Sequence, residues 1–380
     1  MKLQKVASVF LLSLLVIQTA SSQQDTCVEA GKNFRKGVDL SDGSAEEEAL
    51  YRKAIQQCPS MAEAFYNLGV ISARRGQAAE ALVQFDRAAT LSSKAEIWVS
   101  IGGAKADLKD FKGAKEAYLK ALELNSDSES AHLGLGLTYD NLGDIAASEK
   151  HIRKAAELNS SDPISQYNLG VIMVRLNRTA DAISSFENAV KLDDSNFGAQ
   201  LQLGLAYQRV GRYEDSKRSL EKALLLQPEE ASVHKALGVT YEKLAAYEKA
   251  EIEFRRAVKL DDSDTASLIN LGIVMLSKPA PNAKEAEDIL SRAIARDSAS
   301  VKALTALGWA QVELGKYQIA EDTLRRSLDL DADNASAHNN LGVLFLRSGR
   351  DEEARAEFKK ALALDPELEA ASRNLRQFGD

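Results

Sequence analysis

The sequence has few of the residues that most often carry catalysis. It holds four histidines and two cysteines among 380 residues. It contains no GxxxxGK[ST] phosphate loop, no GxSxG nucleophile turn and no HExxH metal motif. His132, His234 and His338 are about 100 residues apart from one another, and His151 stands alone. We therefore expect a protein that is not an enzyme, without a catalytic, cofactor-binding or metal site.

The chain also lacks an excess of positive charge. Lysine and arginine together number 48, aspartate and glutamate number 56, and the formal net charge is −8. The phosphates of nucleic acids and of anionic membranes repel a chain of this sign. We therefore expect neither as the main partner.

The apolar run near the start of the chain is too short to cross a membrane. Residues 6–17 make about 12 residues, whereas a spanning helix needs about 20. Lys2 and Lys5 precede the run, and Ala20-Ser21-Ser22 follows it, as in a secretory signal peptide. We expect residues 1–24 to be such a signal and the mature chain to be periplasmic or secreted. A membrane anchor is the alternative.

What the sequence does contain is a repeated unit of about 34 residues, of which 197–230 is one copy. With Phe197 as position 1, Leu203 and Tyr207 are i,i+4 neighbours on one helix face. Gly211 can close this first helix in the left-handed conformation, and Pro228 marks the end of a second helix. Each unit therefore reads as a helical hairpin, and the fold class is all-α.

Two small residues recur at fixed positions of the unit and let its helices approach closely. Position 8 is glycine in nine of ten copies, with Arg35 in the first, and position 27 is alanine in nine of ten, with Ser327 in the ninth. The glycines are Gly69, Gly102, Gly136, Gly170, Gly204, Gly238, Gly272, Gly308 and Gly342. This pattern resembles the tetratricopeptide repeat, and the resemblance implies an α-solenoid, a right-handed superhelix of hairpins that binds proteins.

The resemblance organises nearly the whole chain. After the signal, we expect a degenerate N-terminal capping repeat over 25–61 and nine repeats over 62–366. A capping helix over 367–380 then closes the array. The repeats begin near Ala62, Ala95, Glu129, Pro163, Phe197, Ala231, Thr265, Val301 and Ala335.

Both cysteines belong to the degenerate first repeat. Cys27 falls at the start of its first helix and Cys58 at the end of its second, and these two ends are neighbours in an antiparallel hairpin. In an exported protein we expect them to form a structural disulfide. Two free thiols are the alternative.

By resemblance, positions 2, 5, 6, 9, 12 and 13 of the first helices line the concave groove. The chaperone-binding members place lysine at position 5 and asparagine at position 9 of one repeat, and this pair is absent here. An asparagine line at position 6 resembles the repeat domain of O-linked N-acetylglucosamine transferase. It comprises Asn67, Asn168, Asn270 and Asn340, with gaps between them. Asparagine is also simply common at this position.

An apolar patch at positions 9 and 12 of the last repeats is the other candidate surface. It comprises Ile273, Leu276, Trp309, Val312, Val343 and Leu346. The alternative is that these side chains pack between adjacent first helices. We predict a non-enzymatic scaffold that binds a protein or peptide in this groove. A self-assembling structural subunit of an envelope complex, or an accessory that presents substrates to a separate enzyme, remain open, as does the oligomeric state.

Overall fold

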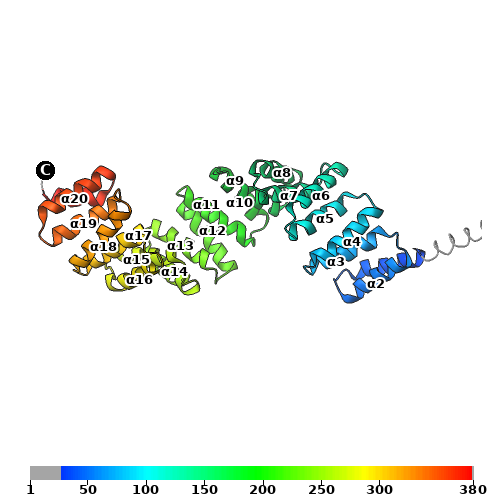
Figure 1. The fold of residues 1–380 in the computed structure, drawn as a ribbon, viewed down its shortest axis with the longest axis horizontal. Coiled ribbons are helices and arrows are strands. Elements are labelled where there is room, and N and C mark those ends of the chain that lie inside the picture. The colour runs from blue at the N-terminus through cyan, green and yellow to red at the C-terminus, as the bar shows by residue number, and fades with distance from the viewer. Residues whose placement is uncertain (1–26, 379–380) are drawn as a thin grey trace, which may run out of the picture. The chain divides into compact units, whose positions relative to one another are not determined.

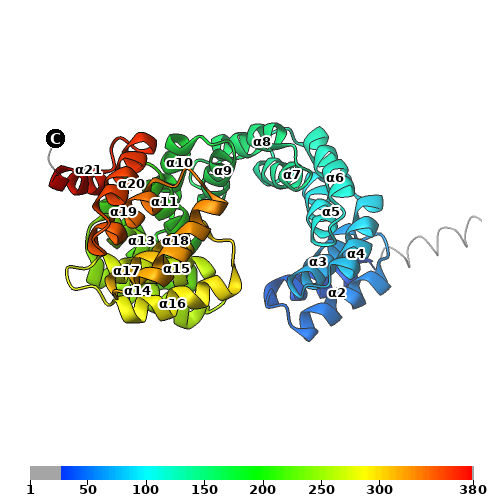
Figure 2. The same ribbon diagram turned by 60° about the vertical axis from the view of Figure 1, so that its left-hand side comes forward.

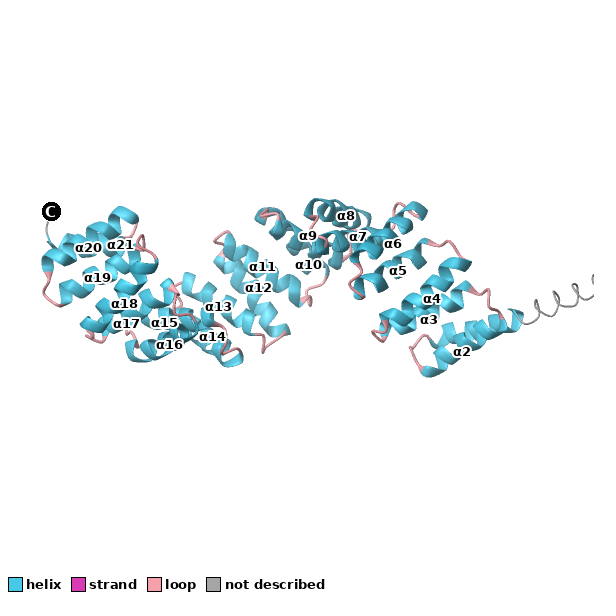
Figure 3. Cartoon of the chain, viewed as in Figure 1, coloured by secondary structure: helices cyan, strands magenta, loops and turns pink. Residues whose placement is uncertain are grey.

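The computed structural model describes residues 27–378, and the expected signal peptide over residues 1–24 lies outside the described residues. Every regular element in 27–378 is a helix, as the colouring of Figure 3 shows. Consecutive helices pair into antiparallel hairpins, which confirms the all-α fold class of stacked helical hairpins. None of the described helices has the length and apolar content to span a membrane.

The chain divides into two compact units, Met1–Leu192 and Asp193–Asp380. The first unit begins with a helix over residues 27–40, followed by the helices labelled in Figure 1. Their bounds are α2 Ala45–Gln57, α3 Ala62–Arg74, α4 Ala78–Leu91, α5 Ala95–Asp107, α6 Phe111–Leu124, α7 Glu129–Asn141, α8 Ile145–Leu158, α9 Pro163–Arg175 and α10 Thr179–Leu192.

The second unit continues the same alternation of first and second helices, and α21 lies against α20 and α19 at its end (Figure 2). Its elements are α11 Phe197–Arg209, α12 Tyr213–Leu226, α13 Ala231–Lys243, α14 Tyr247–Leu260, α15 Thr265–Ser277, α16 Ala283–Arg296, α17 Val301–Glu313, α18 Tyr317–Leu330, α19 Ala335–Arg347, α20 Asp351–Leu364, α21 Glu369–Leu375 and the 3₁₀ turn η1 Arg376–Phe378.

Polar residues at the joints between hairpins fix where the first helices begin. Asn196, for example, precedes α11 and its side chain accepts a hydrogen bond from the backbone N–H of Ala199. Such a cap satisfies one of the four N–H groups that a helix start leaves unpaired. The predicted left-handed turn at Gly211 is confirmed, since its φ is 75°. Ser128, Asp162, Glu230, Asp264, Ser300 and Asn334 cap other first helices in the same way.

The position-8 glycines lie where the two helices of each hairpin are closest. A Cβ built on any of the nine would come within 3.0 Å of a side chain at position 24 of the second helix. The ring of Tyr118 from α6 fits between two glycines, because a Cβ on Gly102 or on Gly134 would overlap it. Burial of this ring raises the pKa of the Tyr118 phenol to about 12.

The first hairpin keeps this contact with a shifted register. The expectation that Arg35 takes the glycine place is wrong, because Arg35 is exposed and Gly37 is buried. A Cβ on Gly37 would lie 2.7 Å from the Tyr51 ring. Cys27 and Cys58 form a disulfide with Cα atoms 4.8 Å apart, so the bond joins the open ends of this hairpin.

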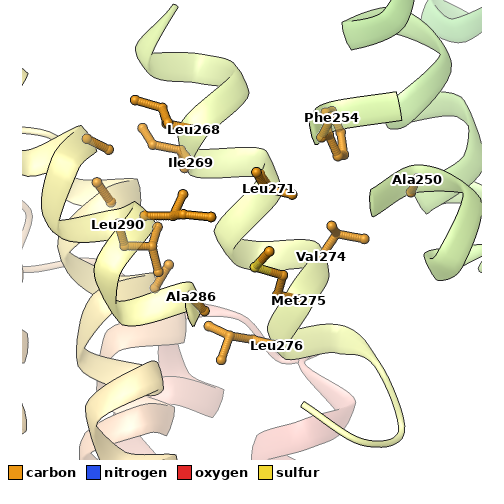
Figure 4. Packing of buried hydrophobic residues seen from close by; sticks show 14 of the residues in the cluster. Ala250, Phe254, Leu268, Ile269, Leu271, Val274, Met275, Leu276, Ala286 and Leu290 are labelled. Carbon is orange, nitrogen blue, oxygen red and sulfur yellow. The ribbon is translucent and has the colours of Figure 1, made fainter. Parts of the chain in front are cut away.

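In the second unit, α15 is buried between two second helices. Leu271 and Val274 point toward Phe254 of α14, and Leu290 lies on the side of α16 (Figure 4). The same cluster of buried residues runs from α12 to α17. This continuous core holds the first helices of the unit in fixed positions relative to one another.

We predict opposite effects of alanine at two adjacent glycines of α5. Gly102→Ala lowers the free energy of unfolding by about 1–3 kcal/mol, because its Cβ overlaps the buried Tyr118 ring. Gly103→Ala raises it by about 0.5–1 kcal/mol, because its Cβ meets nothing closer than 3.8 Å and alanine favours the helix. Denaturant unfolding in a Trp309→Phe background, followed by the fluorescence of Trp98 on the same helix, measures both. Equal effects at the two positions would contradict this account of the glycines.

We predict that removal of the disulfide weakens the first hairpin selectively. The bond closes a loop with a sequence separation of 31, which corresponds to about 3–4 kcal/mol on the chain-entropy model. Cys27→Ser with Cys58→Ser speeds amide exchange in residues 27–57 and leaves α5 to α10 unchanged. The reduced wild-type chain is the control and behaves like the double variant. Uniform exchange across the first unit would contradict a local role.

Candidate binding groove

A groove of about 980 Å³ lies in the second unit, along its last first helices. Its lining residues come from α15, α17, α19 and α21 and from the loop before α19. Successive members of this series contact each other directly. The groove is therefore formed mainly by side chains of first helices, together with the loop before α19.

The floor of the groove is apolar and includes four of the six predicted patch residues. Ile273, Leu276, Trp309 and Val343 line it. Leu276 and Val343 are buried to 9 % exposure, whereas Trp309 and Ile273 are half-buried. Trp309 thus presents part of its ring to the groove while the rest packs against the core.

Val312 does not belong to the patch, and its prediction as a binding residue is wrong. Its side chain is 0 % exposed and belongs to a buried cluster with Leu324 of α18 and Leu341 of α19. These two neighbouring helices cover the last turn of α17. Leu346 is half-buried against the same cluster and does not line the groove.

Arg347 holds the indole of Trp309 from the neighbouring helix. Its guanidinium lies 5.6 Å from the ring centroid, within the range of a cation–π contact. The same group donates a hydrogen bond of 2.9 Å to Glu313 Oε1. Because α17 supplies both Trp309 and Glu313, Arg347 ties α19 to α17 beside the apolar floor.

The four predicted asparagines are divided between the two units. Asn67 and Asn168 belong to the first unit, where Asn67 donates to Tyr51 Oη at 3.1 Å and Asn168 to the carbonyl of its own helix at Ile164. Asn270 and Asn340 belong to the second unit. Only Asn340 of the four lines the large groove.

Within the second unit, the groove contains two side-chain amides that the sequence did not lead us to predict, those of Asn339 and Asn374. Asn374 Nδ2 of α21 donates to Asn339 Oδ1 at 3.1 Å, and Asn339 Nδ2 donates to Asn340 Oδ1 at 3.4 Å. Asn340 Nδ2 in turn reaches the carbonyl of Thr305 on α17 at 3.5 Å. The signal for Asn374 was present, because it stands at position 6 counted from Glu369, the start of α21.

A hydroxyl network supports the groove from behind and explains the exception at position 27. Ser327 Oγ lies 2.8 Å from Thr305 Oγ1, and Asn334 Nδ2 donates to the same Thr305 hydroxyl at 2.9 Å. Alanine at position 327 would leave Thr305 without this partner. The serine thus connects α18 to the polar side of the groove.

The histidines belong to a different, structural arrangement. Each position-4 histidine places Nδ1 against a residue 19 positions later on the second helix of its hairpin, and Nε2 against a carbonyl six positions earlier. His151 does not stand alone, because it is one of these partners. The Nδ1 contacts are His132 to His151 Nδ1 at 3.0 Å, His234 to Glu253 Oε2 at 2.6 Å and His338 to Glu357 Oε2 at 2.5 Å.

The hydrogen-bond partners of His132 determine which ring nitrogen donates in the His132–His151 pair. The Ser126 carbonyl can only accept, so His132 Nε2 donates to it at 3.1 Å. Neutral His132 then accepts at Nδ1, and His151 Nδ1 donates. Burial lowers the pKa of His151, and the nearby His132 and Lys150 lower it further. No group of three or more metal-ligating side chains occurs among the described residues.

We predict that acid destabilises the first unit through His151. The pKa of His151 in the folded state lies below the ordinary value of about 6.5. Between these two pKa values the imidazole is protonated in the unfolded state and neutral in the folded state. Stability is therefore full above about pH 6.5 and falls as the pH drops toward the lowered pKa. Unfolding between pH 7.5 and 5.5, followed by Trp98 in a Trp309→Phe background, measures this fall.

His151→Glu is the matched variant for this test, because it recreates the His–Glu pairs of Glu253 and Glu357. It abolishes the loss of stability between pH 7.5 and 5.5. A loss of equal size in wild type and variant would assign the effect to other groups.

Comparisons with known proteins agree with this architecture. Residues 20–267 match the family model of the cilia and flagella-associated protein 70 C-terminal domain, which covers more than half of the chain. The chain belongs to this family. Residues 305–369 match a tetratricopeptide-repeat model, so the chain is a tetratricopeptide-repeat protein. A search of curated proteins finds no match.

Two solved structures with TM-scores of 0.50 and 0.51 share the fold at low sequence identity. The chain is similar to the anaphase-promoting-complex hetero-tetramer Cut9–Hcn1, with 16% identity, a TM-score of 0.51 and coverage of 93% of this chain and 76% of that one. It is also similar to a tetratricopeptide-repeat protein from Parabacteroides merdae, with 18% identity, a TM-score of 0.50 and coverage of 67% and 99%. MamA matches 43% of this chain over 95% of its own, at 25% identity and a TM-score of 0.41.

Proposed function

We propose that the protein binds a segment of another protein in the groove of its second unit, and that it catalyses no reaction on that segment. The observation that carries the proposal is the half-buried Trp309 on the floor of a groove of about 980 Å³. Grooves of this size with an apolar floor and a few polar groups suit ligand binding. Tryptophan and arginine are the residues that most often dominate such contacts.

The framework of the groove is suited to reversible docking. Leu276 and Val343 are largely buried, so the core fixes their positions before a ligand arrives. Arg347 restrains the Trp309 ring. A preformed site loses little conformational entropy on binding, which favours affinity.

We also propose that the protein acts outside the cytoplasm. The signal-like pattern of residues 1–24 supports this location. The Cys27–Cys58 disulfide supports it independently, because such bonds persist in oxidising compartments.

We predict that Trp309→Ala weakens partner capture at least tenfold while the fold survives. The half-buried ring contributes less to stability than a fully buried one, so we expect a loss of about 1–2 kcal/mol against 3–5 for a core aromatic. Capture of proteins from the source's envelope or secretome, read by mass spectrometry, measures binding, and circular dichroism measures the fold.

Leu225→Ala is the matched control, because Leu225 is an apolar residue of the same unit that is 78% exposed on α12. It leaves capture unchanged. Equal capture by wild type and Trp309→Ala would refute the groove as the binding site.

A further inference from the structure

The polar side of the groove carries two cations without an acidic partner. Lys302 of α17 and Arg373 of α21 both line the groove and are exposed. Lys302 Nζ donates to Asn270 Oδ1 at 2.8 Å, which draws its side chain across toward α15. Among residues 27–378, neither cation makes an ion pair. Both are therefore available to an anion that enters the groove.

The groove amides add further donors. Asn339, Asn340 and Asn374 each use one N–H in the bonds that connect them. A primary amide carries two N–H groups, so the half-buried Asn340 and Asn374 each keep a second one for a ligand. Asn339 is buried to 9 % exposure and connects the other two. Together with the two cations, this surface favours a ligand rich in acceptors, such as carboxylates and backbone carbonyls.

Two acidic residues, Asp331 and Asp333, also line the groove. Asp331 and Asp333 belong to the exposed loop before α19, and the Asp331 carboxylate accepts the backbone N–H of Asp333 at 3.2 Å. Asp331 thus caps a turn of the loop, whereas Lys302 reaches from α17 to α15. The charged residues that the helices contribute to the groove, Lys302, Arg347 and Arg373, are all basic and outnumber the two aspartates of the loop, in a chain whose formal net charge is −8.

The distance between Lys302 and Trp309 determines how far apart the anionic and the apolar group of a ligand must be. The two residues are seven positions apart on α17 and share one face of it, two turns apart, or about 10.5 Å. An extended chain advances about 3.3 Å per residue, so this distance corresponds to about three residues. Arg373 lies on the far side of α19 and requires a second anionic group.

We infer that the groove binds an extended acidic segment with at least two carboxylates. One lies about three residues from a bulky apolar side chain and pairs with Lys302 while the apolar side chain covers Trp309. The other pairs with Arg373, and the amides of Asn340 and Asn374 bind the backbone between them. This inference rests on the proposed function, and it names the chemistry of the partner.

The test is a selection from a displayed library of random twelve-residue peptides on the chain from residue 25 onward. Selected peptides are then synthesised and titrated against four proteins by fluorescence anisotropy. These are the wild type, Trp309→Ala, the charge reversal Lys302→Glu with Arg373→Glu, and Lys359→Glu. Lys359 is an exposed lysine of α20 outside the groove, and its variant is the matched control.

The expected result is enrichment of Asp or Glu about three residues from a large apolar residue. Such peptides lose at least tenfold in affinity with the double charge reversal and with Trp309→Ala, and less than twofold with Lys359→Glu. Their affinity also falls as salt is raised, because salt screens exposed charges. Trp309→Phe, which keeps an aromatic ring, retains most of the affinity.

Two other outcomes overturn the inference in distinguishable ways. Peptides without acidic residues that still depend on Trp309 would refute the acidic partner and leave the proposed function standing. Peptides that bind Trp309→Ala as well as the wild type, or no enrichment over Trp309→Ala, would refute both.

Discussion

Each hairpin depends on the absence of one side chain. Glycine at position 8 of the first helix lets a ring or branched side chain from the second helix lie directly on the backbone. Glycine in a helix costs about 0.5–1 kcal/mol, and full burial of a large apolar side chain contributes about 1.5–3 kcal/mol. At each of these repeats, burial of the side chain from the second helix contributes more free energy than the glycine costs. The close approach that results sets the spacing of the helices around the groove.

The contact between the position-8 glycine and the second helix is also the reason why the fold could be predicted from the sequence. A glycine and an alanine at fixed positions, with apolar residues at helical spacing, leave few alternatives to a stacked hairpin array. The same reading failed at Arg35, because the first helix of the terminal hairpin keeps the glycine contact through Gly37, two residues later. A single degenerate repeat offers no second copy against which its register could be checked.

The site was less predictable than the fold, for a physical reason. Position 9 points toward the groove in several consecutive helices, so Ile273, Trp309 and Val343 could be placed from the repeat pattern. Whether position 12 is free depends on the neighbouring hairpin, and at Val312 that neighbour covers it completely. His132 and His151 lie on two different helices and are 19 residues apart in the sequence. The periodicity of a single helix does not predict which side chains of two helices meet.

The short α21 forms one wall of the groove. This helix spans only Glu369–Leu375, contacts α20 and α19, and supplies both Arg373 and Asn374 to the groove. A helix of seven residues makes fewer stabilising contacts than the longer helices of the array, and such an element opens more readily. A ligand that contacts α21 binds the docked state alone, so its apparent affinity scales with the docked fraction. Occupancy of the groove and docking of α21 are in this way linked, and each one favours the other.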